Sequence, residues 1–373
     1  MTMKRFVSWY PVMVLMTIDL AFAIANILLK KIVSNGTDHL VFITFRQAIS
    51  AIFLSPLAYF LERGKRPKLT GTILWQLFVS AIIGASVTQY LFLLGIEYTS
   101  ATFSCAFLNM VPVVTFFMAL PFRLESVDIN HSGGIAKVVG AVICLGGAIL
   151  LTAYKGIPLF HFSQDDQVTR STGQHYTEIS PSIVRLRWAI GSLALFAATI
   201  CWSSWFILQS YIGKKYPCQY SSTAIMTFFS AIQSAIIGLS FQRDLSVWIF
   251  KNKTDIYIAL YAGMIGSGLC FVGMTWCVKK KGPVFTAAFS PLVQIMSAAF
   301  EVPVLHEQLH LGSLMGSVAI VVGLYILLWG KDKEIKQQQK KNNGLELVSS
   351  PHNQTEVDQK DSNTDFQPTK LQV

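Results

Sequence analysis

The stretch that decides the fold covers residues 97–156 and reads EYTSATFSCAFLNMVPVVTFFMALPFRLESVDINHSGGIAKVVGAVICLGGAILLTAYKG. It contains two apolar segments joined by a charged elbow at Arg123 and Glu125. Much of it returns in the second half of the chain, where Ala106, Glu125, Gly140 and Gly147 are matched by Ala288, Glu307, Gly316 and Gly323. A duplicated pair of apolar spans is typical of transporters that are built from internal repeats.

The composition places most of the chain in a membrane. Of its 373 residues, 52% are hydrophobic and 13% are charged, whereas a soluble domain carries about 25% charged residues. The charges lie in narrow bands, between which six runs carry none: 69–96, 98–122, 188–213, 216–242, 256–278 and 308–330. Because a membrane-crossing helix needs roughly 20 apolar residues, the sequence predicts an all-α polytopic membrane protein.

Ten transmembrane helices account for the apolar runs. Their expected limits are residues 8–29, 40–61, 72–95, 101–122, 135–154, 188–211, 219–241, 256–277, 283–303 and 312–330. Each repeat then has five spans, and since five is odd, the second repeat enters the membrane from the opposite side, which is an inverted-topology repeat. Lysine and arginine are more frequent on the side of the amino terminus, which predicts that both termini are cytosolic.

The predicted organisation has four parts. Residues 8–155 form the first five-span repeat and residues 188–330 form the second. Residues 156–187 are polar without an apolar period and are expected to form an extramembrane loop. Residues 331–373 are rich in Lys, Gln, Asn and Ser, and because they bury too little apolar area to fold, we expect a disordered cytosolic tail.

Other functional patterns are weak. The net charge of +10 does not indicate a nucleic-acid partner, because the basic residues lie at span ends. The six cysteines have no metal-ligand spacing. Residues 306–310, HEQLH, fit the H-E-x-x-H pattern of zinc hydrolases, but they straddle a predicted loop and have no convincing third ligand. The sequons at Asn35 and Asn252 lie on predicted outer loops, and their glycosylation stays open.

Three stretches carry a family resemblance: FRQAISAIFLSPLAYFLERGKRPKLT from residue 45, YTSATF with RLESV in the opening stretch, and GPVF with HEQLHLGSLMGSVAIVVGLYILLWGKDKE near the end. They resemble the plant nodulin-21-like proteins, also called Walls-Are-Thin-related proteins or UMAMITs. These belong to the drug/metabolite transporter superfamily with two EamA repeats. The resemblance covers residues 8–333, with departures at Asp19, where the family often has Gln, and at His306, where it often has Gly.

The resemblance implies a ten-helix carrier that moves amino acids in either direction by facilitated diffusion, in the plasma membrane or the tonoplast. Auxin or a related small organic acid is the alternative substrate, since one branch of the family is linked to auxin transport out of the vacuole. We expect no enzyme activity, cofactor or metal. A membrane zinc hydrolase that uses residues 306–310 is the remote alternative, and a receptor or scaffold without transport is the competing class. Proton coupling and a homodimer stay open.

Charged and polar residues inside spans are the candidate substrate ligands, because such groups are costly in hydrocarbon. Asp19 lies halfway through the first span and would meet a substrate ammonium group, or else bond to neighbouring helices. Asn26 lies seven residues later on the same face. Arg46, with Gln47 beside it, would bind a substrate carboxylate in fork geometry. Alternatively, Arg46 extends to the outer interface or pairs with an acid.

The fourth and ninth spans carry a second candidate set. Asn109 and Pro112 share a helix face, as do Pro291 and Gln294 in swapped order. A proline inside a helix leaves the carbonyl four residues earlier without its partner, so each repeat offers an amide and a free carbonyl near mid-membrane, unless the prolines only curve the helices. Lesser candidates, each alternatively an interhelical hydrogen bond, are Gln89, Thr115, Gln209 and Gln233.

The elbow residues Arg123, Glu125 and Glu307 lie at corresponding ends of the fourth and ninth spans. We predict that they are structural or gating salt-bridge partners rather than substrate ligands. Glycines recur in the fifth and tenth spans, where small residues let helices approach closely. Packing within the chain is the expected use of these glycines, and a seam between two copies is the alternative.

Overall fold

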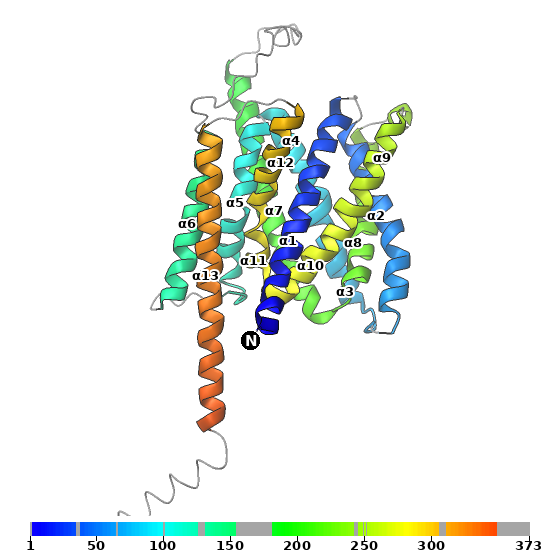
Figure 1. Ribbon diagram of the computed structural model, residues 1–373. Helices are drawn as coiled ribbons and strands as arrows, with labels where there is room; N and C mark the ends of the chain where they lie inside the picture. Colours follow the sequence, from blue (N-terminus) through cyan, green and yellow to red (C-terminus); the bar gives the residue numbers. More distant parts are fainter. Residues whose placement is uncertain are drawn as a thin grey trace, which may run out of the picture.

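Helices that run roughly along one axis build the computed structural model of this chain (Figure 1). It describes residues 2–34, 38–64, 66–99, 101–125, 131–153, 181–241, 245–248, 250, 252–305 and 311–348. Within these ranges the regular secondary structure is helical throughout, with no strand.

Each predicted span corresponds to one helix or to consecutive helical segments. In the first repeat these are α1 (Thr2–Ser34), α2 (His39–Glu62), α3 (Gly71–Ala81) with η1 (Ile82–Val87) and α4 (Thr88–Tyr98), α5 (Ala101–Ala119) and α6 (Ser132–Ala153). In the second repeat they are α7 (Pro181–Lys215), α8 (Gln219–Phe241), α9 (Lys253–Tyr261) with η4 (Ala262–Leu269) and α10 (Cys270–Lys281), α11 (Pro283–Ala287) with α12 (Ser290–Leu305), and α13 (Leu311–Val348). A short 3-10 helix, η3 (Leu245–Trp248), lies between α8 and α9.

Length and hydropathy agree with a membrane-spanning bundle. Among the described residues, 6 helical stretches are long and apolar enough to cross a membrane: Trp9–Leu29, His39–Glu62, Gly71–Tyr98, Arg185–Lys215, Gln219–Phe241 and Lys253–Lys281. Shorter apolar helices at Phe107–Ala119, Ser132–Gly147 and Pro283–Ser297 fall in the predicted fourth, fifth and ninth spans. The prediction of a polytopic all-α membrane protein is therefore confirmed.

Corresponding spans of the two repeats lie antiparallel. At the end of α2, Glu62 accepts hydrogen bonds from the backbone N–H groups of Tyr220 and Ser221, which begin α8. At the other end of the pair, Leu40 of α2 lies near Gly238 of α8. Because α2 and α8 are the second spans of their repeats, the second repeat is inverted relative to the first, as predicted.

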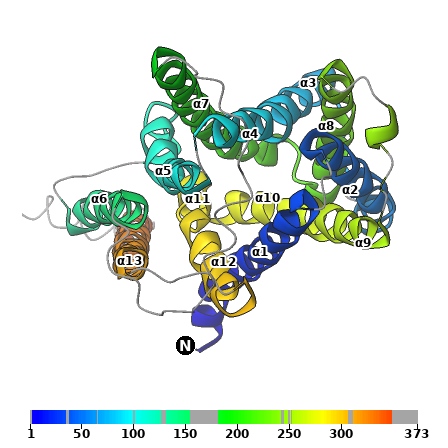
Figure 2. The same ribbon diagram turned by 90° about the horizontal axis from the view of Figure 1, so that it is seen from above.

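The fifth spans of the two repeats, α6 and α13, form a pair of their own at one side of the bundle (Figure 2). Three glycines on each helix recur every seven residues and therefore share one face. They face each other in antiparallel order, with Gly133 against Gly330, Gly140 against Gly323 and Gly147 against Gly316. We call this contact the glycine seam. It uses the glycines for packing within the chain.

The remaining helices exchange partners between the repeats. The fourth span of the first repeat, α5, packs on α7, and the fourth span of the second repeat packs through α12 on α1. In the same way α4 packs on α7, and α10 packs on α1. The amino terminus is marked at the lower edge of the bundle, and α13 leaves the bundle at the same edge (Figure 1). The start of α1 and the end of α13 therefore lie on one side of the bundle.

The structure differs from the sequence prediction along α13. This helix continues to Val348, into the range 331–373 that we predicted as a disordered tail. Lysine, glutamine and glutamate are good helix formers, and Lys331 and Glu334 form ion pairs with Glu125 and Lys137. Local propensity and these ion pairs account for the extension. Residues 349–373 lie outside the described part of the chain.

The third and eighth spans share a feature that the apolar pattern does not indicate. Each contains a π-helical segment at the corresponding position, η1 in the first repeat and η4 in the second. Such segments are rare and are frequently found at functional sites. Because both repeats contain such a segment, the residues around η1 and η4 are candidates for a functional site.

Candidate functional site

The η4 segment lies between α1 and α2, the helices that carry the candidate charged residues. A Cβ atom on Gly263 would lie 2.9 Å from the carbonyl oxygen of Arg46 on α2. A Cβ atom on Gly266 would lie 4.0 Å from the Cβ atom of Ala25 on α1. Glycine therefore lets α2 approach the π-helical turn closely, and α1 packs on its other side.

Asp19 is almost fully buried on α1. The residue is 4% exposed, and its Oδ2 atom has no hydrogen-bond partner among the described residues. The carboxylate lies within electrostatic reach of the thiols of Cys270 and Cys277 on α10. The structural alternative requires neighbouring helices to satisfy the carboxylate, and for Oδ2 the described residues do not do so. The arrangement favours a carboxylate that is available to a substrate.

Arg46 and its neighbours on α2 also keep free polar atoms. The Nε atom of Arg46 is buried without a hydrogen-bond partner among the described residues. Gln47 is 0% exposed, and both atoms of its amide lack such partners. One turn further, the hydroxyl of Ser50 is buried and unpaired, as is that of Ser267 on η4. We group Asp19 of α1 with Arg46, Gln47, Ser50 and Ser267, which lie where α2 meets η4, under the name polar centre.

Ser50 and Ser267 were missed by the sequence reasoning. Gly268, which follows Ser267, faces α2, because its Cβ atom would lie 3.6 Å from the Oγ atom of Ser50. Serine is common in membrane helices as a packing residue, so the sequence alone does not single out these two. The signal that identifies them is the close approach of η4 to α2.

Asn109 and Gln294 meet across the interface between the repeats. The Asn109 amide nitrogen donates to the Gln294 Oε1 atom at 3.1 Å, which joins α5 to α12. The Asn109 Oδ1 atom is buried without a partner among the described residues. The two residues come from the swapped motifs of the fourth and ninth spans, so the structure brings these motifs together.

The two prolines of these motifs have different surroundings. Pro112 lies inside the continuous helix α5. In the ninth span the helix is interrupted: α11 ends at Ala287, and α12 begins at Ser290, directly before Pro291. The missing N–H of a proline is tolerated in the first turn of a helix. The second repeat therefore interrupts its helix at this position, where the first repeat does not.

The lesser glutamine candidates divide into two groups. Gln209 donates to the Ser80 hydroxyl at 2.8 Å, and Gln233 accepts from the Ser86 hydroxyl at 2.9 Å. These are interhelical bonds, which is the alternative that the sequence left open. Oε1 of Gln89 is buried without a partner among the described residues. Thr115 is also fully buried with an unpaired hydroxyl, whereas Asn26 is exposed and does not share the burial of Asp19.

The charged elbow is held by α6 and α13. Glu125 accepts from Lys137 at 3.2 Å and also pairs with Lys331, while Lys137 pairs with Glu334. Three of these four residues, Lys137 on α6 and Lys331 and Glu334 on α13, were not selected from the sequence. Arg123 is exposed and has a positive φ of 53°, which suits the tight turn at the elbow. This arrangement supports a structural role for Glu125.

Glu62 forms a second contact that the sequence reasoning missed. It is 7% exposed, and its carboxylate accepts from the N–H groups of Tyr220 and Ser221 at 3.0 and 2.8 Å and from the Ser221 hydroxyl at 2.6 Å. A carboxylate at a helix amino terminus is favoured by the free N–H groups and by the helix dipole. Burial and the charge of Glu62 raise the pKa of the nearby Cys218 thiol. We call the contact of Glu62 with Tyr220 and Ser221 the inner latch, because it lies on the side of the two termini.

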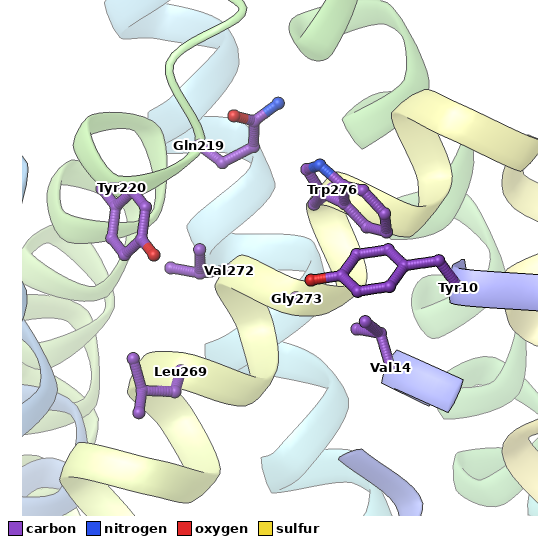
Figure 3. Close-up of a pocket in the computed structure, with 8 residues that line it drawn as sticks. All are labelled: Tyr10, Val14, Gln219, Tyr220, Leu269, Val272, Gly273 and Trp276. Atoms are coloured by element: carbon purple, nitrogen blue, oxygen red, sulfur yellow. The ribbon is translucent and has the colours of Figure 1, made fainter. Parts of the chain in front are cut away.

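A pocket of about 280 Å³ lies beside the inner latch, between α1, the start of α8 and α10 (Figure 3). Its walls include Tyr10, Tyr220 and Trp276 as well as Gly273. A Cβ atom on Gly273 would lie 2.7 Å from Ile18, the residue before Asp19. The pocket therefore adjoins the polar centre but does not contain it.

The two repeats of the chain match one protein-family profile twice. The profile of the EamA-like transporter family matches residues 9–153 and 189–329 of this chain. The chain belongs to the EamA-like transporter family. The two matched ranges correspond to the two repeats described above.

Curated relatives of this EamA-like transporter come from Arabidopsis thaliana. WAT1-related protein At3g30340 is 47% identical over 339 residues, which cover 91% of this chain and 92% of that protein. WAT1-related protein At4g01440 is 45% identical over 331 residues, which cover 89% of each. The resemblance to Walls-Are-Thin-related proteins is thereby confirmed over nearly the whole chain.

A solved crystal structure supports the fold independently. It matches 85% of this chain and 98% of its own with a TM-score of 0.63 at 14% identity. At that identity only the fold is comparable. Together, the family, the relatives and the apolar helices identify an integral multi-pass membrane protein that transports small molecules.

The zinc-hydrolase alternative concerns the H-E-x-x-H pattern at residues 306–310. Residues 306–310, with Glu307 among them, lie outside the described part of the chain, as does Asn35. Among the described residues, no group of three or more His, Cys, Asp or Glu side chains is placed to hold a metal ion. The family and the names of the relatives point to a transporter rather than to an enzyme.

Proposed function

We propose that this EamA-like transporter carries amino acids in either direction by alternating access. The observation that carries the proposal is an acidic and a basic residue inside spans, Asp19 on α1 and Arg46 on α2, each with a buried side-chain atom that has no hydrogen-bond partner among the described residues. Unpaired charges inside a membrane are costly and are mostly kept for function. A zwitterionic amino acid offers an ammonium group to Asp19 and a carboxylate to Arg46.

The neutral groups of the polar centre complete such a site. Gln47, Ser50 and Ser267 keep unpaired donors and acceptors in a buried region. A buried polar group without a partner costs about 1–3 kcal/mol, and a substrate that bonds to it offsets that cost. The site therefore suits a small polar ligand with both a donor and an acceptor end.

Alternating access requires contacts that break between the repeats. The Asn109–Gln294 bond joins α5 to α12, and the inner latch joins α2 to α8. Both contacts cross between the repeats, and each consists of one to three hydrogen bonds. In this mechanism the repeats rock about the polar centre while the glycine seam stays closed.

A small aromatic acid such as auxin is the second candidate. The observation that favours it is an aromatic cluster in the core, in which Trp202 stacks on Trp205 at 4.9 Å and Phe271 lies edge-on to both. Phe271 directly follows Cys270, and Cys270 is close to Asp19. An aromatic acid would use Arg46 and leave Asp19 without a partner.

The test is export of a panel of radiolabelled amino acids and auxin from expressing cells, with and without a pH gradient. We expect export of at least one amino acid, and a loss of about tenfold or more in Arg46→Ala, since a charge-assisted bond is worth roughly 1.5–3 kcal/mol. Arg63→Ala removes an exposed guanidinium that rests on Tyr59 and is the control. Flux of auxin without any amino acid selects the second candidate, and no flux at all indicates a receptor or scaffold.

We also propose that both termini face the cytosol, in the plasma membrane or the tonoplast. The basis is the excess of lysine and arginine on the side of the two termini, for which Lys279, Lys280 and Lys281 at the end of α10 are an example. Protease protection of a carboxyl-terminal tag in sealed vesicles tests the orientation. Cleavage of the tag only from the luminal or outer side contradicts it.

A further inference from the structure

The pocket beside the inner latch lies at the membrane boundary on the side of the two termini. Tyr10 is near the start of the first span, Tyr220 is near the start of the seventh, and Trp276 is near the end of the eighth. Tyrosine and tryptophan are enriched at such boundaries, because an apolar ring and a polar end suit the headgroup region. The aromatic rim of the pocket is therefore at headgroup level.

The deeper wall of the pocket is apolar and open to the outside of the bundle. Val14, Leu269 and Val272 form this wall. Leu269 is 43% exposed and Tyr10 is 58% exposed, so the pocket opens on the surface that faces lipid in a membrane. Its volume of about 280 Å³ takes part of a hydrocarbon chain rather than a whole lipid.

Two hydroxyl groups face the pocket. The hydroxyls of Tyr10 and Tyr220 point toward each other across it, whereas the Gln219 amide points away from both (Figure 3). No described residue is bonded to either hydroxyl. These groups suit the oxygen atoms of a lipid ester or phosphate, which accept hydrogen bonds.

Two lysines supply positive charge next to this rim. Lys279 donates to the carbonyl of Pro217 at 3.4 Å. Pro217 is two residues before Gln219 in the sequence, so this bond brings Lys279 close to the start of α8. Lys280 is exposed and lies one helical turn beyond Trp276 on the same face of α10. Basic residues between transmembrane helices at the cytoplasmic side are typical of sites for anionic lipid headgroups.

We propose that the pocket binds an anionic phospholipid of the leaflet on the side of the two termini. One acyl chain lies against Val14, Leu269 and Val272, and the phosphate lies at Lys279 and Lys280 within reach of the tyrosine hydroxyls. Tyr220 lines the pocket and also donates its backbone N–H to Glu62. A bound lipid therefore stabilises the inner latch and favours the conformation in which this side is closed. The proposal holds for either candidate substrate.

The experiment uses the purified, delipidated full chain with added phosphatidylglycerol or phosphatidylcholine. We expect phosphatidylglycerol to raise the melting temperature by roughly 3 °C and to remain bound in native mass spectra, and phosphatidylcholine to do neither. The double variant Lys279→Ala/Lys280→Ala should bind phosphatidylglycerol roughly 30-fold more weakly, since each lysine near an anionic surface contributes about a factor of five.

The control variant is Lys333→Ala/Lys336→Ala, which removes two lysines from α13 on the same side but away from α10 (Figure 2). It should keep the response to phosphatidylglycerol. Equal stabilisation by both lipids, or an unchanged response in the Lys279→Ala/Lys280→Ala variant, overturns the proposal. Equal stabilisation by glycerol phosphate, which has no acyl chain, assigns the lysines to a soluble anion and also overturns it. Displacement of the lipid by the transported amino acid identifies the pocket as a substrate site instead.

Discussion

The glycine seam and the polar centre are two interfaces between the same pair of repeats, and they are built in opposite ways. In the seam, α6 and α13 approach so closely that a Cβ atom on Gly140 would lie 2.5 Å from the backbone nitrogen of Leu327. In the polar centre, Gln47 is 0% exposed, yet its amide has no partner among the described residues. The seam has no space for a larger side chain at Gly140. The polar centre, in contrast, contains buried polar atoms without a hydrogen-bond partner among the described residues.

The difference separates the parts that hold the fold from the parts that move. Close backbone packing is lost as soon as two helices separate, so the seam favours one arrangement. Unsatisfied polar groups destabilise the state that contains them and are expected where function requires a ligand. The repeats can then rock at the polar centre while the seam keeps them joined.

The largest effect is expected when the stability of Gly140→Ala is compared with that of Gly146→Ala. Alanine normally stabilises a helix by about 0.5–1 kcal/mol relative to glycine, and nothing lies within 4 Å of a Cβ atom at Gly146. At Gly140 the added methyl group meets backbone atoms of Leu327 and Gly323. We expect Gly140→Ala to lower stability by about 3 kcal/mol and Gly146→Ala to raise it slightly.

Thermal unfolding in detergent and the yield of monodisperse protein measure both variants. If Gly140→Ala and Gly146→Ala behave alike, α6 and α13 are not in the close contact described, and the seam loses its role as the rigid part of the molecule.

A second test concerns the inner latch, through Glu62→Gln. The amide keeps one acceptor atom but presents an NH2 group to N–H donors of α8, so we expect a loss of about 2 kcal/mol in stability. Cys218 then reports on the opening together with the loss of the Glu62 charge, because it is 4% exposed and both burial and that charge raise the pKa of its thiol. With Cys218 as the single cysteine, maleimide labelling at neutral pH should be slow in the parent and at least about tenfold faster in the variant.

The same labelling gives a pH dependence. A raised thiol pKa means that less thiolate is present at a given pH, so labelling of the parent should keep rising above pH 9, the ordinary value for the group. Glu97→Gln, which alters an exposed carboxylate at the end of α4, is the control and should change neither rate nor stability. Equal labelling of the parent and Glu62→Gln rules out the latch.

Much of the fold is predictable from the sequence because charges are excluded from hydrocarbon. The predicted span 219–241 coincides with α8, and the repeated glycines predicted close helix packing within the chain, which α6 and α13 supply. The π-helical segments are not predictable in this way, because an uninterrupted apolar run has no period that distinguishes one helical pitch from another. The extension of α13 follows helix propensity, which the compositional argument for a disordered tail ignored.

The candidate site was predictable where a residue is unusual in its own span. Asp19 and Arg46 are charges in apolar runs, and the shared spacing of Asn109 with Pro112 and of Pro291 with Gln294 is visible in the repeat. Glu62 was not predictable, because it is one charge among several at a span end. Its partners lie 158 and 159 residues away along the chain. Ser50 and Ser267 become candidates only when the approach of η4 to α2 is known.

A third test, Gln47→Met, asks whether the polar centre is kept for function. Methionine has a similar length and no amide, so the variant should gain about 1 kcal/mol in stability if the buried amide is unpaired. Transport should fall about tenfold if that amide contacts the substrate. The control is Gln233→Met, which removes an amide bonded to Ser86 and to the carbonyl of Phe78.

The control should lose about 1 kcal/mol in stability, so the two glutamines are expected to respond with opposite sign. Melting temperature and initial export rate are measured for both. A Gln47→Met variant that is less stable and transports normally would assign the amide to the structure and remove Gln47 from the site.

The smallest effect is expected for the single bond between Asn109 and Gln294. Each of the variants Asn109→Leu and Gln294→Leu removes the same hydrogen bond, so the double variant should lose about 1 kcal/mol less than the sum of the two single losses. Thermal unfolding of the four proteins gives this coupling, and additive losses would show that the two amides act independently. The expected value is small for a physical reason. A contact between the repeats that breaks in every transport cycle is compatible with rapid exchange only if its free energy stays near that of one hydrogen bond, whereas the seam, which stays closed, has no such limit.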